Sequence, residues 1–301
     1  MESFPKKEQT PFENLNIKEQ WDSQVEIMGN LGILQTFPEL GIYGIKGIDG
    51  KEYAVPTYED IQERLEANKE EFELKIKQGF KVILIEPFGY SIDKLIKKYE
   101  SVIVKHHKTG KLFATKEKDS DPDESLDLDV NQPIYTNDNY KKEGNIVYFP
   151  KEFSEKHQGK TKKELLLEDP KNGFNIWLIE ENPNIPREGK GVTIGSRPQL
   201  ETNKTSTEYL NILKTNKIYK HESGLTPEAD IMLSILRLEQ KNQVSNDYRG
   251  KGALSYQIGS YFVSGGVPGS GWDRDSSQAD LYGYVPWNRY SNDGFRPGVR
   301  V

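Results

Sequence analysis

The chain of 301 residues contains no cysteine. Disulfides, thiolate catalysis and cysteine-ligated metals are therefore excluded together. No apolar run approaches the roughly 18 residues that a membrane-spanning helix needs. The opening MESFPKKEQT also lacks the apolar segment of a signal peptide. We expect no membrane insertion and a cytoplasmic location by default, with association with a virion or a cell surface left open.

Acidic residues outnumber basic residues by 47 to 41. The formal net charge is −6 and the sequence pI is near 5.5. A general nucleic-acid binder, or a protein that docks on anionic membranes, depends on clustered cationic side chains. The charge balance argues against both functions, and no nucleic-acid partner is expected.

The C-terminal stretch lacks Lys and Glu, which are abundant in the rest of the chain, and it also lacks Met. From Gly252 to Val301 there is no Lys, no Glu and no Met. Tyr, Trp, Gly, Ser and Asp take their place, and five of the nine Arg lie from Arg249 onward. Rigid rings, Arg forks and small polar side chains offer large contact area at low cost in side-chain entropy. The composition predicts a binding face in this tail.

Histidine is also missing from the tail, because the last of the four His is His221. No His can act there as a general base or a metal ligand. Asp273, Asp275 and Asp280 leave two alternatives open: a hydrolase or lyase that uses them as acid and base, or the calcium site of a carbohydrate-binding lectin. The simpler interpretation is that Asp273 and Asp275 pair with Arg274 or cap turns. On that interpretation we expect no catalytic residue, no metal site and no cofactor.

The first half of the chain shows mixed helical and strand patterns. Residues 1–30 are polar and predict an N-terminal arm. Residues 57–78 predict a helix, with Thr57 and Asp60 as a capping box and apolar residues at helical spacing. Residues 31–150 as a whole predict an α/β region, either an independent domain or an elaboration of the same core as the rest. Strands are expected at 80–85, 101–104, 146–150 and 174–181, and short helices at 91–99 and 160–169.

The acidic stretch EKDSDPDESLDLDV at 117–130 is the strongest local charge feature. Asp119, Asp121 and Asp123 copy the alternation of a calcium-binding loop, but the Gly at its turn and the Glu at its last ligand position are missing. A solvated loop is therefore the favoured interpretation.

Two capped helices precede the tail. Thr205 with Glu208 begins one of them, and Thr226 followed by Pro227 begins the other, whose apolar stripe belongs in a core. The chain ends on DGFRPGVRV, which predicts a strand. Residues 266–293 hold so many turn formers that we expect a surface loop system there.

The tail GVPGSGWDRDSSQADLYGYVPWNRYSNDGFRPGVRV resembles the C-terminus of C-type lectin folds of the formylglycine-generating-enzyme (sulfatase-modifying factor) type. Those folds finish on a Gly-Phe-Arg strand, here Gly294, Phe295 and Arg296. Within that group the tail is most similar to the variable proteins of diversity-generating retroelements, known from phages, archaeal viruses and small-genome prokaryotes. The likeness covers the tail well, the two preceding helices weakly, and residues 1–150 not at all.

The resemblance implies an α+β protein in which residues 151–301 form a C-type lectin ligand-binding domain with variable-type loops at 256–293. The enzymes of this fold work through paired cysteines, and iron-dependent relatives need a His cluster. This chain has no cysteine, and its tail has no His. The resemblance therefore carries over no enzymatic activity.

The resemblance also implies which tail positions vary. Diversity-generating systems copy template adenines unfaithfully, so altered Asn codons reach Tyr, Ser, Asp, Arg and Gly but never Lys, Glu, Gln, Met or Trp. On this rule Trp272 and Trp287 are scaffold or fixed contact positions. Varied, outward-facing side chains are implied at Ser264, Arg274, Ser276, Ser277, Asp280, Tyr282, Tyr284, Arg289, Tyr290 and Ser291.

Composition and resemblance together predict a non-enzymatic protein that binds a macromolecule, either a protein or a cell-surface glycan, through a diversifiable C-terminal surface. Aromatic side chains supply contact area in such a surface, and Arg supplies bidentate and cation–π contacts. The side chains expected in these roles are Tyr282, Tyr284, Trp287, Tyr290, Arg274 and Arg289.

Overall fold

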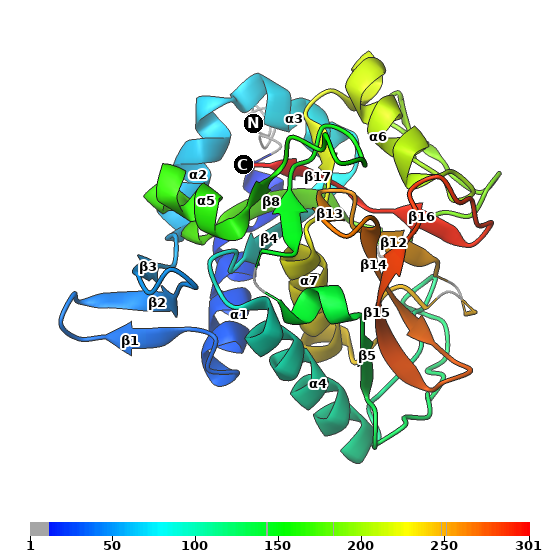
Figure 1. The fold of residues 1–301 in the computed structure, drawn as a ribbon, viewed down its shortest axis with the longest axis horizontal. Helices are drawn as coiled ribbons and strands as arrows, with labels where there is room; N and C mark the ends of the chain where they lie inside the picture. Colours follow the sequence, from blue (N-terminus) through cyan, green and yellow to red (C-terminus); the bar gives the residue numbers. More distant parts are fainter. Residues whose placement is uncertain (1–11, 143, 183, 248, 251) are drawn as a thin grey trace, which may run out of the picture.

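The computed structural model describes residues 12–142, 144–182, 184–247, 249–250 and 252–301. Its centre is an antiparallel four-stranded sheet in the order β11-β17-β8-β4 (Figure 1). The two longest strands, β8 and β4, are almost wholly apolar and are buried, with Trp177 of β8 fully enclosed. The bounds are Glu222–Gly224 for β11, Pro297–Arg300 for β17, Asn175–Glu180 for β8 and Phe80–Glu86 for β4.

Helices surround this sheet. Helices α1, α3 and α7 contact β4, and α4 packs along α7. Thr226 caps α7 by accepting from the Ala229 amide, and Pro227 occupies the first turn, as the sequence predicts. The apolar stripe of α7 lies in the main core. The bounds are Ile17–Asn30 for α1, Lys69–Lys77 for α3, Ile92–Lys108 for α4 and Pro227–Lys241 for α7.

Helix α1 closes the free edge of the four-stranded sheet with two glutamines one helical turn apart. The Gln24 amide donates to the Ile83 carbonyl over 2.7 Å, and its carbonyl accepts from the Ile85 amide over 2.9 Å. Gln20 satisfies the backbone of Lys81 and Ile83 in the same way. These side chains take the place of a fifth strand and protect the edge. The polar arm predicted for 1–30 is therefore wrong in its described part, and residues 1–11 lie outside the described residues.

A second, five-stranded sheet has the order β16-β12-β14-β15-β5. Its centre is a hairpin of two seven-residue strands, β14 and β15. The prediction of a surface loop system over 266–293 is therefore wrong for these two strands. The glycines that suggested turns lie inside β14, where neighbouring side chains fill the space above them. The bounds are Asp293–Phe295 for β16, Leu254–Tyr256 for β12, Val267–Asp273 for β14, Gln278–Tyr284 for β15 and Ile134–Thr136 for β5.

The remaining elements complete the periphery. A small antiparallel sheet of β1, β2 and β3 projects from the body at the left of Figure 1. Strand β6 joins β13 and β7, β9 pairs with β10, and α6 begins at the predicted Thr205–Glu208 capping box. The bounds are Gln35–Phe37, Ile42–Lys46 and Glu52–Ala54 for β1 to β3, Ile146–Tyr148 for β6, Lys160–Thr161 for β7, Thr193–Ile194 for β9, Arg197–Pro198 for β10, Ser260–Phe262 for β13, Tyr58–Ala67 for α2, Lys162–Glu168 for α5 and Ser206–Thr215 for α6.

One helix prediction and one strand prediction need correction. The helix expected over 57–78 is two helices, α2 and α3, because Asn68 between them has non-helical angles. The strand expected at 101–104 is the second half of α4. Its β-branched residues Val102 and Ile103 continue the stripe begun by Leu95, and all three are buried. Packing against α7 outweighs their strand propensity.

Strands from both sides of residue 150 share sheets. β4 pairs with β8, β5 with β15, and β6 with β13. One hydrophobic cluster reaches from Phe12 to Val299, and a smaller one gathers around α6 with Tyr209, Tyr256 and Phe295. The chain is a mixed α+β protein. Within the described residues, no helix has the length and apolar character that crossing a bilayer requires.

Candidate functional site

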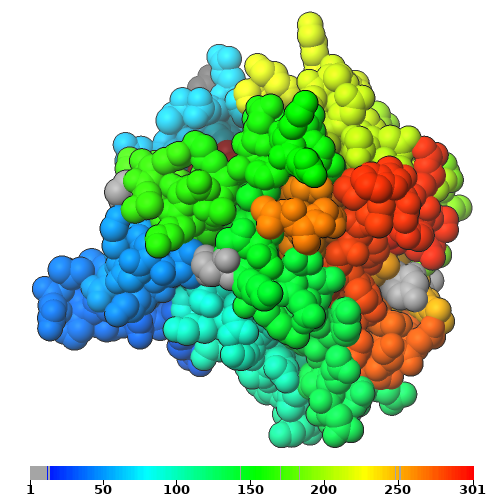
Figure 2. Space-filling view, in the orientation of Figure 1, coloured from blue at the N-terminus to red at the C-terminus, as the bar shows by residue number. Residues whose placement is uncertain are grey.

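One face of the five-stranded sheet packs on the main core, and the other face is covered in part by the smaller cluster around α6 and is in part exposed. On β15, Ala279 and Leu281 belong to the main core, so the alternation of a strand places Asp280, Tyr282 and Tyr284 on the opposite side. We call this outward side, with its side chains Tyr135, Tyr256, Asp280, Tyr282, Tyr284 and Asp293 and the adjoining Tyr290, the tyrosine face. In Figure 2 the C-terminal residues, orange to red, form one side of the molecule.

The rings of the tyrosine face form a continuous chain. Tyr282 lies 5.1 Å from Tyr135 and 6.1 Å from Tyr284, measured between ring centroids. Tyr284 in turn lies 5.1 Å from Tyr256 and 6.3 Å from Tyr290. Tyr290 is 45% exposed and Tyr135 is 36% exposed, Tyr282 and Tyr284 are half-buried, and Tyr256 is enclosed. Edge contacts of this kind stabilise each ring pair by about 0.5–1.5 kcal/mol, so the rings hold one another in place.

Two glycines of β14 make room for side chains of the neighbouring strands. Gly269 stands opposite Tyr282 in the register, and a Cβ at that position would lie 2.5 Å from the Tyr284 ring. Gly271 stands opposite Asp280, and a Cβ there would collide with Leu254. The glycines therefore let side chains from neighbouring strands lie flat against the backbone.

Two enclosed carboxyl groups underlie the rings. Asp280 is 1% exposed and accepts from the Gln278 amide over 2.8 Å. Burial raises the pKa of Asp280 to about 6, and hydrogen bonding from Tyr282 and Gln278 limits the rise. Burial likewise raises the pKa of Asp293 to about 6, against the lowering effect of Tyr256. Among the described residues, neither carboxyl group has a cation within ion-pair distance.

The loop after β15 extends the tyrosine face. Trp287 is 72% exposed, and Arg289, Tyr290 and Ser291 are exposed beside it. Arg289 pairs with Glu208 at the start of α6, which ties this loop to the body. These predicted contact residues do lie at the surface, next to Tyr282 and Tyr284 along the chain.

The predicted residues at 274–277 lie elsewhere, in the turn between β14 and β15 at the end of the hairpin. The Arg274 guanidinium donates to Asp247 over 2.7 Å and also pairs with Glu124. Asp273 accepts from the Asp275 amide and the Ser276 hydroxyl, so it caps this turn. The structure therefore does not bring Arg274, Ser276 and Ser277 together with the tyrosines. Ser264 is also separate, in the turn before β14, where its hydroxyl donates to Asn139 over 2.9 Å.

Two predicted site residues are buried rather than exposed. Trp272 is 1% exposed and stands opposite Ala279 in the register, on the core side of the sheet. It is therefore a scaffold residue and not a contact. Asp280 lies on the outward side but is enclosed by its neighbours, which corrects its expected exposure. In a strand, successive side chains point to opposite faces of the sheet. Because residues 266–293 are expected to be loop, this rule could not be used to tell core-side positions from outward ones.

Three members of the tyrosine face were missed by sequence reasoning. Tyr135 comes from β5, whose parallel pairing with β15 brings it beside Asp280. Nothing in the local sequence around 135 signals this partner. Tyr256 and Asp293 lie within the predicted variable region, but only the adjacency of β12 and β16 shows that they lie side by side.

Metal ligands do not gather in the structure. Over the described residues there is no group of three His, Asp or Glu side chains that could hold a metal ion. Asp119, Asp121 and Asp123 lie in an irregular segment with bends and turns, and Asp123 pairs with Lys116 over 2.8 Å.

Comparison of the chain with protein-family models, with curated proteins and with solved structures gave no match in any of the three.

Proposed function

We propose that this protein is a non-enzymatic ligand-binding protein that presents the tyrosine face as a recognition surface on a C-type lectin scaffold. One observation carries the proposal. A chain of partly exposed rings lies on one side of a sheet whose other side is packed into the core. Side chains on the outward side can therefore change while the backbone that carries them keeps its packing.

The chemistry of the face favours a macromolecular ligand. Aromatic rings and Arg dominate the energetics of protein interfaces, and this face combines several tyrosine rings with the exposed Trp287 and Arg289. A standard interface buries about 800 Å² on each partner, so a macromolecular ligand of that kind would cover both the exposed rings and the adjoining loop with Trp287. Tyr hydroxyl groups at the rim add hydrogen bonds to a protein or a glycan.

The resemblance of the tail supports the scaffold assignment. Gly294, Phe295 and Arg296 join β16 to β17, so the chain does finish on strands that carry this sequence. Phe295 packs against Tyr209 at 4.8 Å between ring centroids and anchors the sheet to α6. We propose that Tyr282, Tyr284, Arg289, Tyr290 and Ser291 are the diversifiable positions, and that Asp280 and Trp272 are fixed.

A second candidate function is a hydrolase with Asp280 as general acid. It is favoured by the pKa of Asp280, which burial raises to about 6, because a general acid works best with a pKa near the working pH. Under this alternative Asp280→Asn abolishes turnover of a glycan substrate, whereas a binding protein shows no turnover in either form.

Sequencing of this locus across a natural population tests the proposed function. Differences are expected to concentrate at Tyr282, Tyr284, Arg289, Tyr290 and Ser291, while α2 and α7 stay unchanged. The replacements are expected to be those reachable by altering adenines. An even scatter of substitutions over the chain would remove the diversification and leave only a fixed binding surface.

A further inference from the structure

A cavity of about 870 Å³ lies away from the tyrosine face. It opens between α1, α7, the ends of β4 and β8, and residues 116–119, and no member of the tyrosine face lines it. Cavities of this volume hold ligands of metabolite size. Arg237 of α7, Ser245 and Arg296 all contribute to its wall.

The wall presents hydrogen-bond donors. Arg237 donates to the Gln243 carbonyl, but its Nε is buried and has no partner among the described residues. The described part of the chain also places no carboxylate within ion-pair distance of Arg237. The Ser245 hydroxyl is buried and likewise has no protein partner there. Buried polar groups left in this state cost stability unless a ligand satisfies them.

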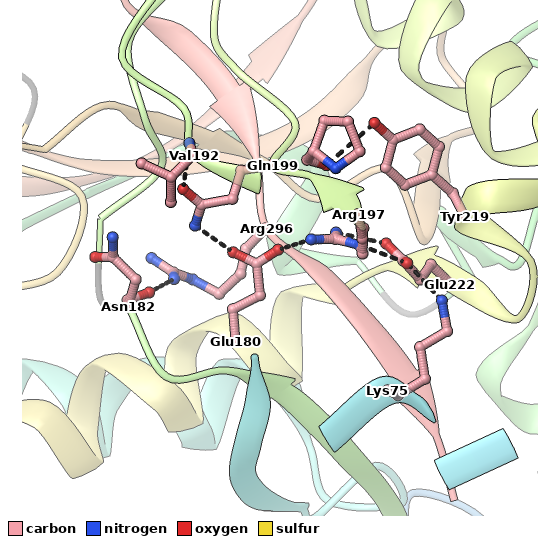
Figure 3. A network of polar contacts seen from close by, with 10 residues as sticks. Lys75, Glu180, Asn182, Val192, Arg197, Gln199, Tyr219, Glu222 and Arg296 are labelled. Atoms are coloured by element: carbon pink, nitrogen blue, oxygen red, sulfur yellow. Dashed lines mark hydrogen bonds and ion pairs between the residues drawn. The ribbon is translucent and has the colours of Figure 1, made fainter. Parts of the chain in front are cut away.

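Arg296 adds a second guanidinium group. It is 4% exposed and donates to the Asn182 carbonyl over 3.0 Å (Figure 3). The nearby Glu180 carboxylate is already engaged, because it accepts from Arg197 over 2.6 Å and from Gln199 over 3.1 Å. Burial and the charge of Arg296 together lower the pKa of Arg237 to about 10, so Arg237 remains cationic at neutral pH.

The residues that line the cavity carry a net positive charge, whereas the whole chain carries a net negative charge. The described lining holds seven Lys and Arg against four Asp and Glu, whereas the chain has 41 basic and 47 acidic residues. One of the four, Glu181, is paired with Lys81 over 2.9 Å. Asp119 is the acidic residue whose field opposes the lowering of the Arg237 pKa. A small anion in the cavity would therefore meet a local excess of positive charge.

We propose that this cavity binds a small organic anion, with a phosphate or carboxylate group held by Arg237, Arg296 and the Ser245 hydroxyl. Guanidinium groups bind both oxyanions through paired hydrogen bonds, and the Nε of Arg237 and the hydroxyl of Ser245 supply donors at the same site. The proposal is independent of the tyrosine face.

Thermal unfolding and calorimetric titration with inorganic phosphate and with citrate, in chloride buffer of equal ionic strength, test this site. Saturable binding of at least one probe is expected for the wild-type protein, with a rise in Tm. Arg237→Gln is expected to weaken that binding at least tenfold, and Ser245→Ala several-fold. Arg289→Gln, the same change on the exposed tyrosine face, serves as the matched control and is expected to bind like the wild type.

The same variants distinguish a ligand site from a structural arginine. In probe-free buffer Arg237→Gln is expected to unfold at the wild-type temperature or above it, because a desolvated charge without a carboxylate partner is removed. A lower Tm in that buffer would overturn the proposal. So would the absence of saturable binding, or a rise in Tm that Arg237→Gln shares, which is the general effect of an excluded salt. A response to phosphate alone assigns a phosphate ligand, and a response to citrate alone assigns a carboxylate.

Discussion

Two groups of buried charged residues, the Arg197 network beside the four-stranded sheet and the two acids of the tyrosine face, differ in how their charges are compensated. Beside the four-stranded sheet, Arg197 lies between two carboxylates, donating to Glu222 over 2.7 Å and to Glu180 over 2.6 Å (Figure 3). Lys75 adds a third cationic contact, 2.6 Å from Glu222. On the five-stranded sheet, Asp280 and Asp293 are enclosed by rings and have no cationic partner in the described part of the chain.

The difference indicates a structural role for the Arg197 network. The network around Arg197 joins α3, β8, β11 and the segment around β10, and every charge in it has an opposite charge at hydrogen-bond distance. Such a network holds elements in register. Asp280 lies on β15, which also carries the partly exposed rings of Tyr282 and Tyr284, and its buried Oδ2 has no hydrogen-bond partner among the described residues, so a ligand could complete its hydrogen bonding. Mutations in the Arg197 network are therefore expected to change stability, and under the proposed function mutations of the exposed residues of the tyrosine face are expected to change binding.

The largest expected effect comes from breaking the Arg197 network. Arg197→Met leaves Glu180 and Glu222 buried with reduced compensation and is expected to cost about 3–5 kcal/mol of unfolding free energy. Urea unfolding measures this cost. Lys97→Met is the matched control, because its pair with Asp93 is exposed on α4 and such a pair contributes about 0–1 kcal/mol. Equal costs for the two variants would contradict the structural role of the network.

Two neighbouring residues of β15 sharpen the comparison within one strand. Leu281→Ala removes a core side chain and is expected to cost about 2–5 kcal/mol. Tyr282→Ala removes a half-buried ring from the outward side and is expected to cost about 1 kcal/mol, close to the value of its ring contacts. Urea unfolding of both variants checks the difference. A cost for Tyr282→Ala that matches Leu281→Ala would show that the tyrosine face is part of the core.

The smallest expected effect concerns pH. The pKa of Asp280 is raised to about 6 in the folded protein from about 3.9 in an unfolded chain, so the folded state binds more protons between these values. This contribution to stability is complete below about pH 4 and is lost as the pH rises through about 6. Asp280→Asn lacks the dependence, so its stability relative to the wild type should increase from pH 4 to pH 7. A constant difference across that range in urea unfolding would refute the burial of this acid.

Local signals predicted much of the framework. Thr57, Thr205 and Thr226 each cap the expected helix, because capping depends on residues three positions apart. The apolar runs of β4 and β8 are equally local. The same signals failed for Val102 and Ile103, whose strand propensity is overridden by packing of α4 on α7. What surrounds a residue in space decided these cases.

The candidate site was predicted in part. The exposed Trp287, Arg289 and Tyr290 follow from composition, because rings and Arg in a segment rich in Gly and Ser suit a contact surface. The placement of Trp272 and Tyr282 on opposite faces of the sheet could not be predicted, because it depends on the hairpin register of β14 and β15. Tyr135 required the pairing of strands far apart in the chain.

A displayed library tests the central claim most directly. One library randomises Tyr282, Tyr284, Arg289 and Tyr290, and a matched library randomises the core-side positions Ile134, Trp272, Ala279 and Leu281. Both are sorted for protease resistance and then for binding to a panel of proteins and glycans. The outward library is expected to keep most clones protease-resistant and to yield specific binders, whereas the core-side library loses resistant clones. An outward library that fails to fold, or that folds and yields no binder, would contradict the assignment of the tyrosine face as a recognition surface.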